Sequence, residues 1–213
     1  MERAQEEKNS FLYKLLRFTI VYRTYQKLVI KKSTYNFIYK NIFKTNSRSI
    51  VLDCGCGPAQ YRKLIDCKKY VGIDFNKKHI QTAEKRFPLD TFINDDVLNI
   101  NLSKFEKFTD ILLFGLIHHL SDENSKTLIN KLSAHLEVGG KIVTIDPVYV
   151  NGNSIYKKLA NFVASKDQGN FVRSQNEYLE LLKPSNLEII SKIYNRLLRI
   201  PFHHHIMYIQ NKI

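Results

Sequence analysis

From Ser49 onward the sequence alternates short β-rich runs with helical segments, and this alternation constrains the fold more than any other feature. Such alternation predicts βαβ units, which build a mostly parallel sheet with helices on both faces, a Rossmann-like α/β fold. The expected strands are 50–53, 70–74, 91–94, 110–114 and 141–145. The expected helices are 77–86 and 122–136, the second ended by Gly139-Gly140.

The C-terminal part departs from this alternation. Further helices are expected at 154–165 and 177–182, and two last strands at 187–194 and 206–210. The segment between those strands is too short for a crossover helix, so a hairpin with an antiparallel last strand is expected. Open α/β sheets bind ligands at the carboxyl ends of their strands, which is where the site should lie.

A glycine turn, Asp53-Cys54-Gly55-Cys56-Gly57-Pro58, follows the first strand. Glycines there permit a tight turn and the close approach of a ligand to the backbone. The dinucleotide fingerprint has a third glycine where this chain has Gln60, which disfavours a bound pyrophosphate. The carboxylate of Asp53 suits a ligand with an ammonium group better than one with phosphates.

Acids also follow the next two strands. Asp74 ends the second strand, where a carboxylate can accept hydrogen bonds from both hydroxyls of a ribose. Asp95 and Asp96 follow the third strand, and the strand alignment favours Asp96 as the acceptor for the exocyclic amine of adenine. An amino-acid head, a ribose and an adenine are the three parts of S-adenosylmethionine.

These motifs resemble, in order and spacing, the class I S-adenosylmethionine-dependent methyltransferases of the small-molecule, type 11-like branch. Further motifs that carry the resemblance are Leu116-Ile117-His118-His119-Leu120 and Leu136-Glu137-Val138-Gly139-Gly140-Lys141. The resemblance covers residues 49–147 and implies a seven-stranded sheet with an antiparallel last strand. The cofactor-binding residues it implies are Asp53, Gly55, Cys56, Gly57, Asp74, Phe75, Asp95, Asp96, Val97, Phe114 and Gly115.

Two adjacent histidines, His118 and His119, follow the fourth strand at the expected catalytic face. Either could take the proton from a substrate hydroxyl, and His118 is the first choice. Packing beneath the cofactor remains the alternative. A base is needed only if the acceptor holds its proton tightly, as a hydroxyl does, because positioning alone accelerates an in-line methyl transfer.

The insertion at 148–184 corresponds to the acceptor site in the family. Arg173 there suits a phosphate or carboxylate group, although a surface ion pair is equally compatible with the sequence. His203 to His205 form a run before the last strand, and adjacent residues on a strand cannot all face one ion, so no metal site is expected. The substrate-binding candidates are Tyr149, Tyr156, Arg173, Tyr178 and His203.

The N-terminal segment, residues 1–48, carries a charge of +8 out of the chain's +13. An amphipathic, aromatic-rich helix is expected at 10–32, and we expect 1–48 to form a helical lid on a methyltransferase domain of residues 49–213. One alternative is that the basic N-terminal segment contacts RNA, and another is that 10–32 contacts an anionic membrane surface. A basic face that is merely solvated is also compatible with the charge.

The remaining composition favours a cytoplasmic protein. The chain has no secretory signal pattern and no uncharged apolar run of spanning length, and its three cysteines are too few for a disulfide framework. The favoured function is methyl transfer to a small molecule, a sugar or another hydroxylated metabolite with or without a phosphate. An RNA methyltransferase, a peripheral membrane methyltransferase on a lipid-linked acceptor, and a non-enzymatic cofactor-binding regulator are the alternatives.

Overall fold

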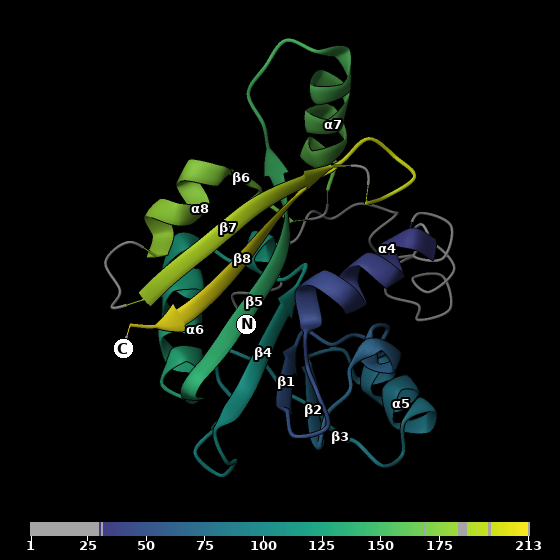
Figure 1. Ribbon diagram of the computed structural model, residues 1–213, viewed down its shortest axis with the longest axis vertical. Coiled ribbons are helices and arrows are strands. Elements are labelled where there is room, and N and C mark those ends of the chain that lie inside the picture. Colours follow the sequence, from purple (N-terminus) through teal and green to yellow (C-terminus); the bar gives the residue numbers. More distant parts are fainter. Residues whose placement is uncertain (1–29, 31, 168, 183–186, 196, 213) are drawn as a thin grey trace.

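The computed structural model describes residues 30, 32–167, 169–182, 187–195 and 197–212. Their centre is one mixed sheet in the order β3-β2-β1-β4-β5-β8-β7, with β6 paired to β5 outside this path (Figure 1). All pairings are parallel except those of β8, which runs antiparallel to β5 and β7. The Rossmann-like sheet with an antiparallel last strand is therefore confirmed. The strands are β1 Ile50–Cys54, β2 Lys69–Asp74, β3 Thr91–Asn94, β4 Phe108–Phe114, β5 Leu136–Tyr149, β6 Arg173–Ser174, β7 Leu187–Asn195 and β8 His203–Asn211.

Three helices begin at residues whose side chains cap free backbone N–H groups. Asn76 caps α5, Ser121 caps α6 and Ser154 caps α7. The α-helices are α4 Lys32–Phe37, α5 Lys77–Arg86, α6 Asp122–Ser133, α7 Ile155–Ser165 and α8 Gln175–Leu182. A π-helical turn spans Ile38–Phe43, and 3-10 turns span Arg62–Leu64 and Ile117–His119.

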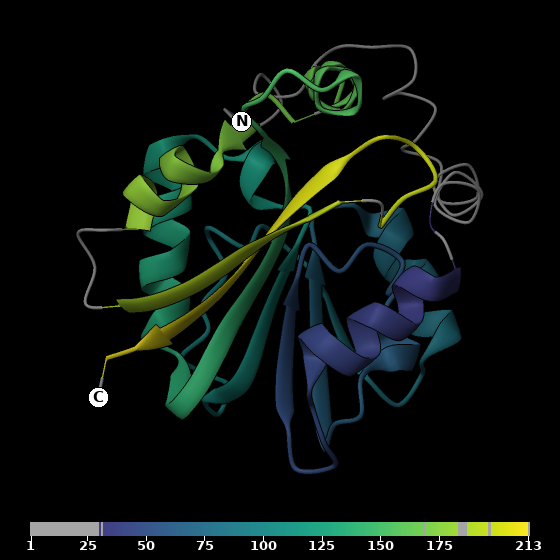
Figure 2. The same cartoon turned by 45° about the horizontal axis from the view of Figure 1, so that its top comes forward.

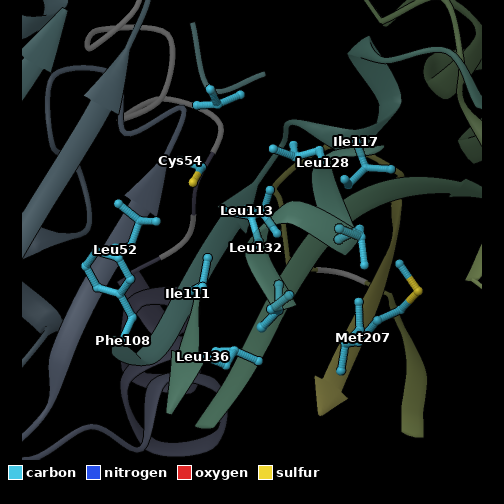
Figure 3. Packing of buried hydrophobic residues seen from close by; sticks show 14 of the residues in the cluster. Leu52, Cys54, Phe108, Ile111, Leu113, Ile117, Leu128, Leu132, Leu136 and Met207 are labelled. Atoms are coloured by element: carbon cyan, nitrogen blue, oxygen red, sulfur yellow. The ribbon is translucent and has the colours of Figure 1, made fainter. Parts of the chain in front are cut away.

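Side chains of alternate residues in the central strands pack into two hydrophobic cores, one on each face of the sheet. Figure 3 shows the larger core, in which Leu52, Ile111 and Leu113 from the strands meet Leu128 and Leu132 of α6. On the opposite face, Val51 and Leu112 pack with residues of the N-terminal π-helical turn. Because both faces are covered, the free edge of the sheet at its carboxyl end is left for a ligand.

Two sequence expectations about element ends were wrong. The helix expected to reach Leu136 ends at Ser133, and β5 already begins at Leu136 and runs through Gly139-Gly140 and Asp146-Pro147. Its last residues extend past Ile145, the end of its pairing with β4, and pair instead with β8 and β6. The longer strand carries the insertion at 148–184 beyond the sheet edge, where Figure 1 shows α7.

The described part of the N-terminal segment packs on the sheet. Ile38 and Ile42 are buried in the second core, and Figure 2 shows α4 lying against the strands. The Tyr208 hydroxyl donates to the carbonyl of Asn41, and the Thr34 hydroxyl donates to the carbonyl of Leu197. Residues before Ser49 therefore contribute to the core, although the sequence predicted that 49–213 form the domain and 1–48 a lid on it. The expected helix at 10–32 lies outside the described residues, apart from Ile30 and Lys32, so its lid role stays a prediction.

Within the part of the chain that the structure describes, no helix has both the length and the apolar character needed to cross a membrane.

Candidate active site

The strand order brings the ends of β3, β2, β1 and β4 side by side along the carboxyl edge of the sheet. The glycine turn lies at the middle of this edge, and Gly55 and Gly57 adopt φ angles of 74° and 54°. Such angles favour glycine over any residue with a side chain. The backbone N–H groups of Gly55 and Cys56 both donate to the carbonyl of Ile73, which fixes the turn to the end of β2.

Asp74 links the glycine turn to the start of α5. Its Oδ2 accepts from the Gly57 N–H at 2.8 Å, and its Oδ1 accepts from the Asn76 N–H at 2.8 Å. His79 Nδ1 also lies 3.6 Å from Asp74 Oδ1. A carboxylate has about four acceptor sites, so Asp74 keeps acceptor capacity for a ligand hydroxyl. The adjacent Phe75 is 57% exposed and lies at the rim.

The loop after β3 completes this edge. Asp96 Oδ1 accepts from the Leu98 N–H, and Asp95 Oδ1 accepts from the Asp96 N–H, so both acids also order the loop. Asp95 is exposed, Asp96 is half-buried, and Val97 is buried in the larger core. The geometry is compatible with the preference for Asp96 over Asp95, and the assignment remains a prediction.

The side chain of Asp53 is buried, although the sequence predicted that its carboxylate faces an ammonium group of the ligand. Its side chain is 3% exposed, and its Oδ2 accepts a 2.5 Å hydrogen bond from the hydroxyl of the buried Tyr70. Burial raises the pKa of Asp53 to about 7, although the Tyr70 hydrogen bond opposes the rise. This carboxyl therefore faces the interior instead of presenting a full negative charge to an ammonium group at the sheet edge.

Phe114 and Gly115 end β4 beside the glycine turn. Gly115 has a φ of 64° and its N–H donates to the carbonyl of Ile145 at 2.7 Å. The Phe114 ring meets the ring of Tyr61 edge-on at 5.5 Å. The chain turns at Gly115 into the 3-10 turn that contains His118 and His119, so these histidines lie close to the carboxyl edge of the sheet.

His118 is clamped between two carboxylates. Its Nδ1 lies 2.8 Å from Asp146 Oδ1, at the end of β5, and its Nε2 lies 3.1 Å from Asp167 Oδ1, in the loop after α7. Burial alone would lower the pKa of His118, but hydrogen bonds to both carboxylates outweigh it and raise the pKa to about 9. Burial alone would raise the pKa of Asp167, but its hydrogen bond with His118 lowers that pKa to about 2.

This geometry runs against the expectation that His118 is a general base. A base must be unprotonated at the working pH and have a free nitrogen toward the substrate. His118 carries a proton on each nitrogen near neutrality, and both nitrogens are engaged. In the structure His118 holds the insertion at 148–184, because the Phe171 N–H also donates to the His118 carbonyl at 3.0 Å.

His119 lies on the same turn, half-buried, with its ring centroid 4.2 Å from that of His118. Donor atoms of His118, His119 and Asp167 come within 4.8 Å of one another, a spacing compatible with a metal ion. Sequence reasoning weighed metal binding only for 203–205 and missed this grouping. The direct His118–Asp167 ion pair accounts for the approach of two of the three donors.

Arg173 forms an ion pair with the exposed Asp122, but its own guanidinium is buried and engaged by the protein, which does not favour the predicted role as a substrate ligand. Its side chain is 7% exposed, and its Nη2 donates to Asp122 Oδ1 at 2.7 Å and to the Leu120 carbonyl at 2.8 Å. Its Nη1 donates to the Phe171 carbonyl at 2.8 Å. The planar guanidinium thus joins the insertion to the loop and helix that follow His119.

A cavity of about 510 Å³ opens between the end of β5, the start of α8 and the facing ends of β7 and β8. Two of the predicted substrate residues, Tyr149 and His203, line it. Tyr156 contacts the His203 ring edge-on at 5.5 Å without lining the cavity. Tyr178 is fully buried and donates to the carbonyl of Pro147, so its assignment to the substrate site is corrected to the core.

The run His203 to His205 is part of β8, so its expected position before the last strand was wrong. His203 and His205 are 6% and 0% exposed, and their rings meet those of Tyr156 and Tyr178. His204 points to the other side of the strand, against Phe202. Burial lowers the pKa of His204 and of His205 to about 4, so these imidazoles are neutral.

The sheet order, the glycine turn and the acids at the strand ends agree with the class I methyltransferase fold that the sequence motifs predicted. Residues 51–140 match the family model described as a methyltransferase domain. The resemblance seen in the sequence motifs is thereby confirmed.

One curated relative is also described as a methyltransferase. An uncharacterized methyltransferase of Anoxybacillus flavithermus is 32% identical over 118 residues, which are 53% of this chain. The chain spans 55% of that relative's length.

Solved structures show the same fold. An S-adenosylmethionine-dependent methyltransferase of Clostridium acetobutylicum superposes with a TM-score of 0.70 at 15% identity, covering 92% of this chain and 99% of that one. The N-methyltransferase NodS of Bradyrhizobium japonicum gives 0.63 at 15% identity, covering 85% and 96%. The plantazolicin methyltransferase BpumL, in complex with S-adenosylhomocysteine and a triazolic desmethyl analogue, gives 0.61 at 21% identity, covering 84% of each chain.

Proposed function

We propose that this chain transfers a methyl group from S-adenosylmethionine to a small-molecule acceptor. The single observation that carries the proposal is Asp74, a buried carboxylate that ties the glycine turn to the end of β2 and retains acceptor capacity. A ribose fits there, with its hydroxyls on Asp74 and its adenine toward Asp96 and Val97. The amino-acid end then lies toward Gly55 and Gly115.

The cofactor supplies a methyl group on a sulfonium when bound, and the residues of this chain position it. The rigid turn at Gly55 and Gly57 and the fixed end of β4 hold the reacting atoms in line, which is worth about 7–11 kcal/mol at best. The acceptor enters from the cavity beyond the end of β5, where Tyr149 lies within electrostatic reach of Asp167. No proton transfer to His118 is assigned, because both its nitrogens are engaged.

The acceptor class that we favour is a hydroxylated small molecule. The plantazolicin enzyme binds a desmethyl analogue of plantazolicin, and NodS is an N-methyltransferase, so peptides and amines belong in the same test. RNA and lipid-linked acceptors depended on the basic residues 1–48, of which 1–29 and 31 lie outside the described structure. A cytoplasmic location remains part of the proposal.

The test is release of S-adenosylhomocysteine, measured by mass spectrometry, over panels of hydroxylated metabolites, amines and peptides. Acceptor-dependent release by the wild type, and at most a tenth of it by Asp74→Ala, supports the proposal. A wild type that takes up no S-adenosylmethionine, or an Asp74→Ala variant with equal turnover and equal cofactor affinity, contradicts it.

A further inference from the structure

The cavity of about 510 Å³ has an unusual charge balance. Besides tyrosines and aliphatic groups, its lining consists of hydroxyl and amide side chains, one lysine and one histidine, and it includes no aspartate or glutamate among the described residues. The polar members are Asn151, Lys157, Ser174, Gln175, Asn176, Asn195 and His203. A lining with a cation and no acid favours an anionic occupant.

Lys157 is held in place at the wall of this cavity. Its Nζ donates to the Asn151 carbonyl at 2.8 Å, and its stem lies against Gly152, where an added Cβ would come within 2.8 Å of the lysine Cδ. Among the residues that the structure describes, no carboxylate forms an ion pair with Lys157. An ammonium group has three donors, so two remain for a ligand.

His203 lines the same cavity, and its side chain has no hydrogen-bond partner among the described residues at either ring nitrogen. The residue is only 6% exposed. Burial and the charge of Lys157 lower the pKa of His203, so the two groups lie within electrostatic reach of each other. A buried imidazole without partners costs free energy unless a ligand supplies them.

The nearby described acids that do not line the cavity, Glu177 and Asp167, do not neutralise the charge of Lys157. Glu177 is exposed and its Oε2 accepts from the backbone N–H and the hydroxyl of Ser174. Burial and the charge of Asp167 raise the pKa of Tyr149, so Asp167 is close to the cavity, but its charge is paired with His118. The positive charge of Lys157 is the one left for a ligand among the described residues of this cavity.

We propose that the methyl acceptor carries an anionic group, a carboxylate or a phosphate, that pairs with Lys157 while a polar group of the acceptor hydrogen-bonds to His203. The proposal rests on the proposed function for the statement that the occupant is a methyl acceptor. The anion site itself stands on the cavity, the lysine without a carboxylate partner and the partnerless histidine among the described residues.

The test titrates ¹⁵N-labelled full-length protein with inorganic phosphate and, separately, with acetate, at constant ionic strength in chloride. We expect saturable shifts at Ser174, Asn176 and Asn195 with at least one of the two anions, and the anion that binds more tightly identifies the charged group. Lys157→Gln should weaken binding by about tenfold or more, because a charged hydrogen-bond pair is lost. Lys158→Gln, the exposed neighbour on α7, is the matched control and should bind as the wild type does.

His203→Gln keeps a hydrogen-bonding group and should retain the phosphate or acetate site, whereas it should raise the KM of any acceptor identified by S-adenosylhomocysteine release. Absence of shifts with both anions, or equal weakening in Lys157→Gln and Lys158→Gln, overturns the proposal. Calorimetry with S-adenosylhomocysteine on the same variants separates the two claims: unchanged cofactor binding with lost anion binding in Lys157→Gln supports the anion site. A wild type that binds anions but no cofactor refutes only the proposed function.

Discussion

Asp167 Oδ1 lies 3.1 Å from His118 Nε2, so the loop after α7 closes an ion pair with the turn that follows β4. Asp146 holds the other nitrogen of the same ring at 2.8 Å. Three segments that are distant in sequence are thereby fixed at the carboxyl edge of the sheet. The contact couples the insertion at 148–184 to the carboxyl edge of the sheet through one charged imidazole.

The stability of the fold should fall on the alkaline side through His118. The pKa of His118 is raised from 6.5 to about 9 in the folded chain. The stabilisation from this ring is therefore fully present below pH 6.5 and is lost as the pH rises through about 9, to an extent of roughly 3 kcal/mol. Urea unfolding between pH 6.5 and 9.5 measures it.

His118→Asn should flatten that decline, and His135→Asn, which changes a histidine just after the end of α6, should leave it as in the wild type. An equally steep decline in His118→Asn would show that the Asp146–His118–Asp167 cluster is not charged as described. Asp167 is the partner of His118 in this ion pair, and its pKa is lowered. The stabilisation that Asp167 contributes is lost as the pH falls through about 2.

Arg173→Ala should destabilise the fold by about 2–4 kcal/mol, because the carbonyls of Leu120 and Phe171 lose a buried donor. Asp122→Asn is the matched change on the partner. The Asp122 side chain is 68% exposed, so we expect a cost of only about 0–1 kcal/mol. Thermal and urea unfolding of both variants decide the point, and equal losses would mean that the ion pair, and not the carbonyl contacts, supplies the stabilisation.

Gly169→Ala should loosen the insertion. An added Cβ at Gly169 would overlap Cδ2 of His118 and approach the His118 carbonyl to 2.5 Å, so the loop must shift. We expect a loss of about 1–3 kcal/mol in stability together with a lower pKa of the His118 ring, which histidine NMR reads directly. An unchanged ring titration would place the loop away from His118.

Much of the fold and of the cofactor edge could be predicted from the sequence. Strand runs such as 70–74 and the glycine turn are local signals, because periodicity and turn chemistry act over a few residues. The hairpin argument also predicted the antiparallel last strand correctly. Local sequence signals were therefore sufficient to predict the order of the strands and helices along the chain.

The side-chain partners could not be predicted, because they join segments far apart in the chain. The sequence around Asp53 does not indicate that the Tyr70 hydroxyl donates to its carboxylate. The sequence around His118 likewise does not indicate its ion pair with Asp167. The ends of β5 and β8 were misjudged for a related reason: their mutual pairing keeps Asp146-Pro147 and 203–205 in strand. Tertiary pairing overrode the local turn signals.

The three cysteines should differ sharply in reactivity. Burial raises the pKa of Cys54 and Cys56 far above the ordinary thiol value, whereas Cys67 is only half-buried. A thiol reagent added to the native protein at pH 8 should modify Cys67 first, with Cys54 and Cys56 protected until the chain unfolds. Peptide mass mapping of the labelled protein identifies the sites, and early labelling of Cys56 would contradict the closed glycine turn.

The central claim is that the carboxyl edge of the sheet binds S-adenosylmethionine through Asp74. Isothermal titration calorimetry with S-adenosylhomocysteine tests it most directly, on the wild type, on Asp74→Ala and on Asp66→Ala, an exposed acid before the start of β2. We expect binding by the wild type, a loss of tenfold or more in Asp74→Ala because about 1.5–3 kcal/mol of charged hydrogen bonding is removed, and no change in Asp66→Ala. A folded Asp74→Ala variant that binds as tightly as the wild type, or a wild type that does not bind, would contradict the claim.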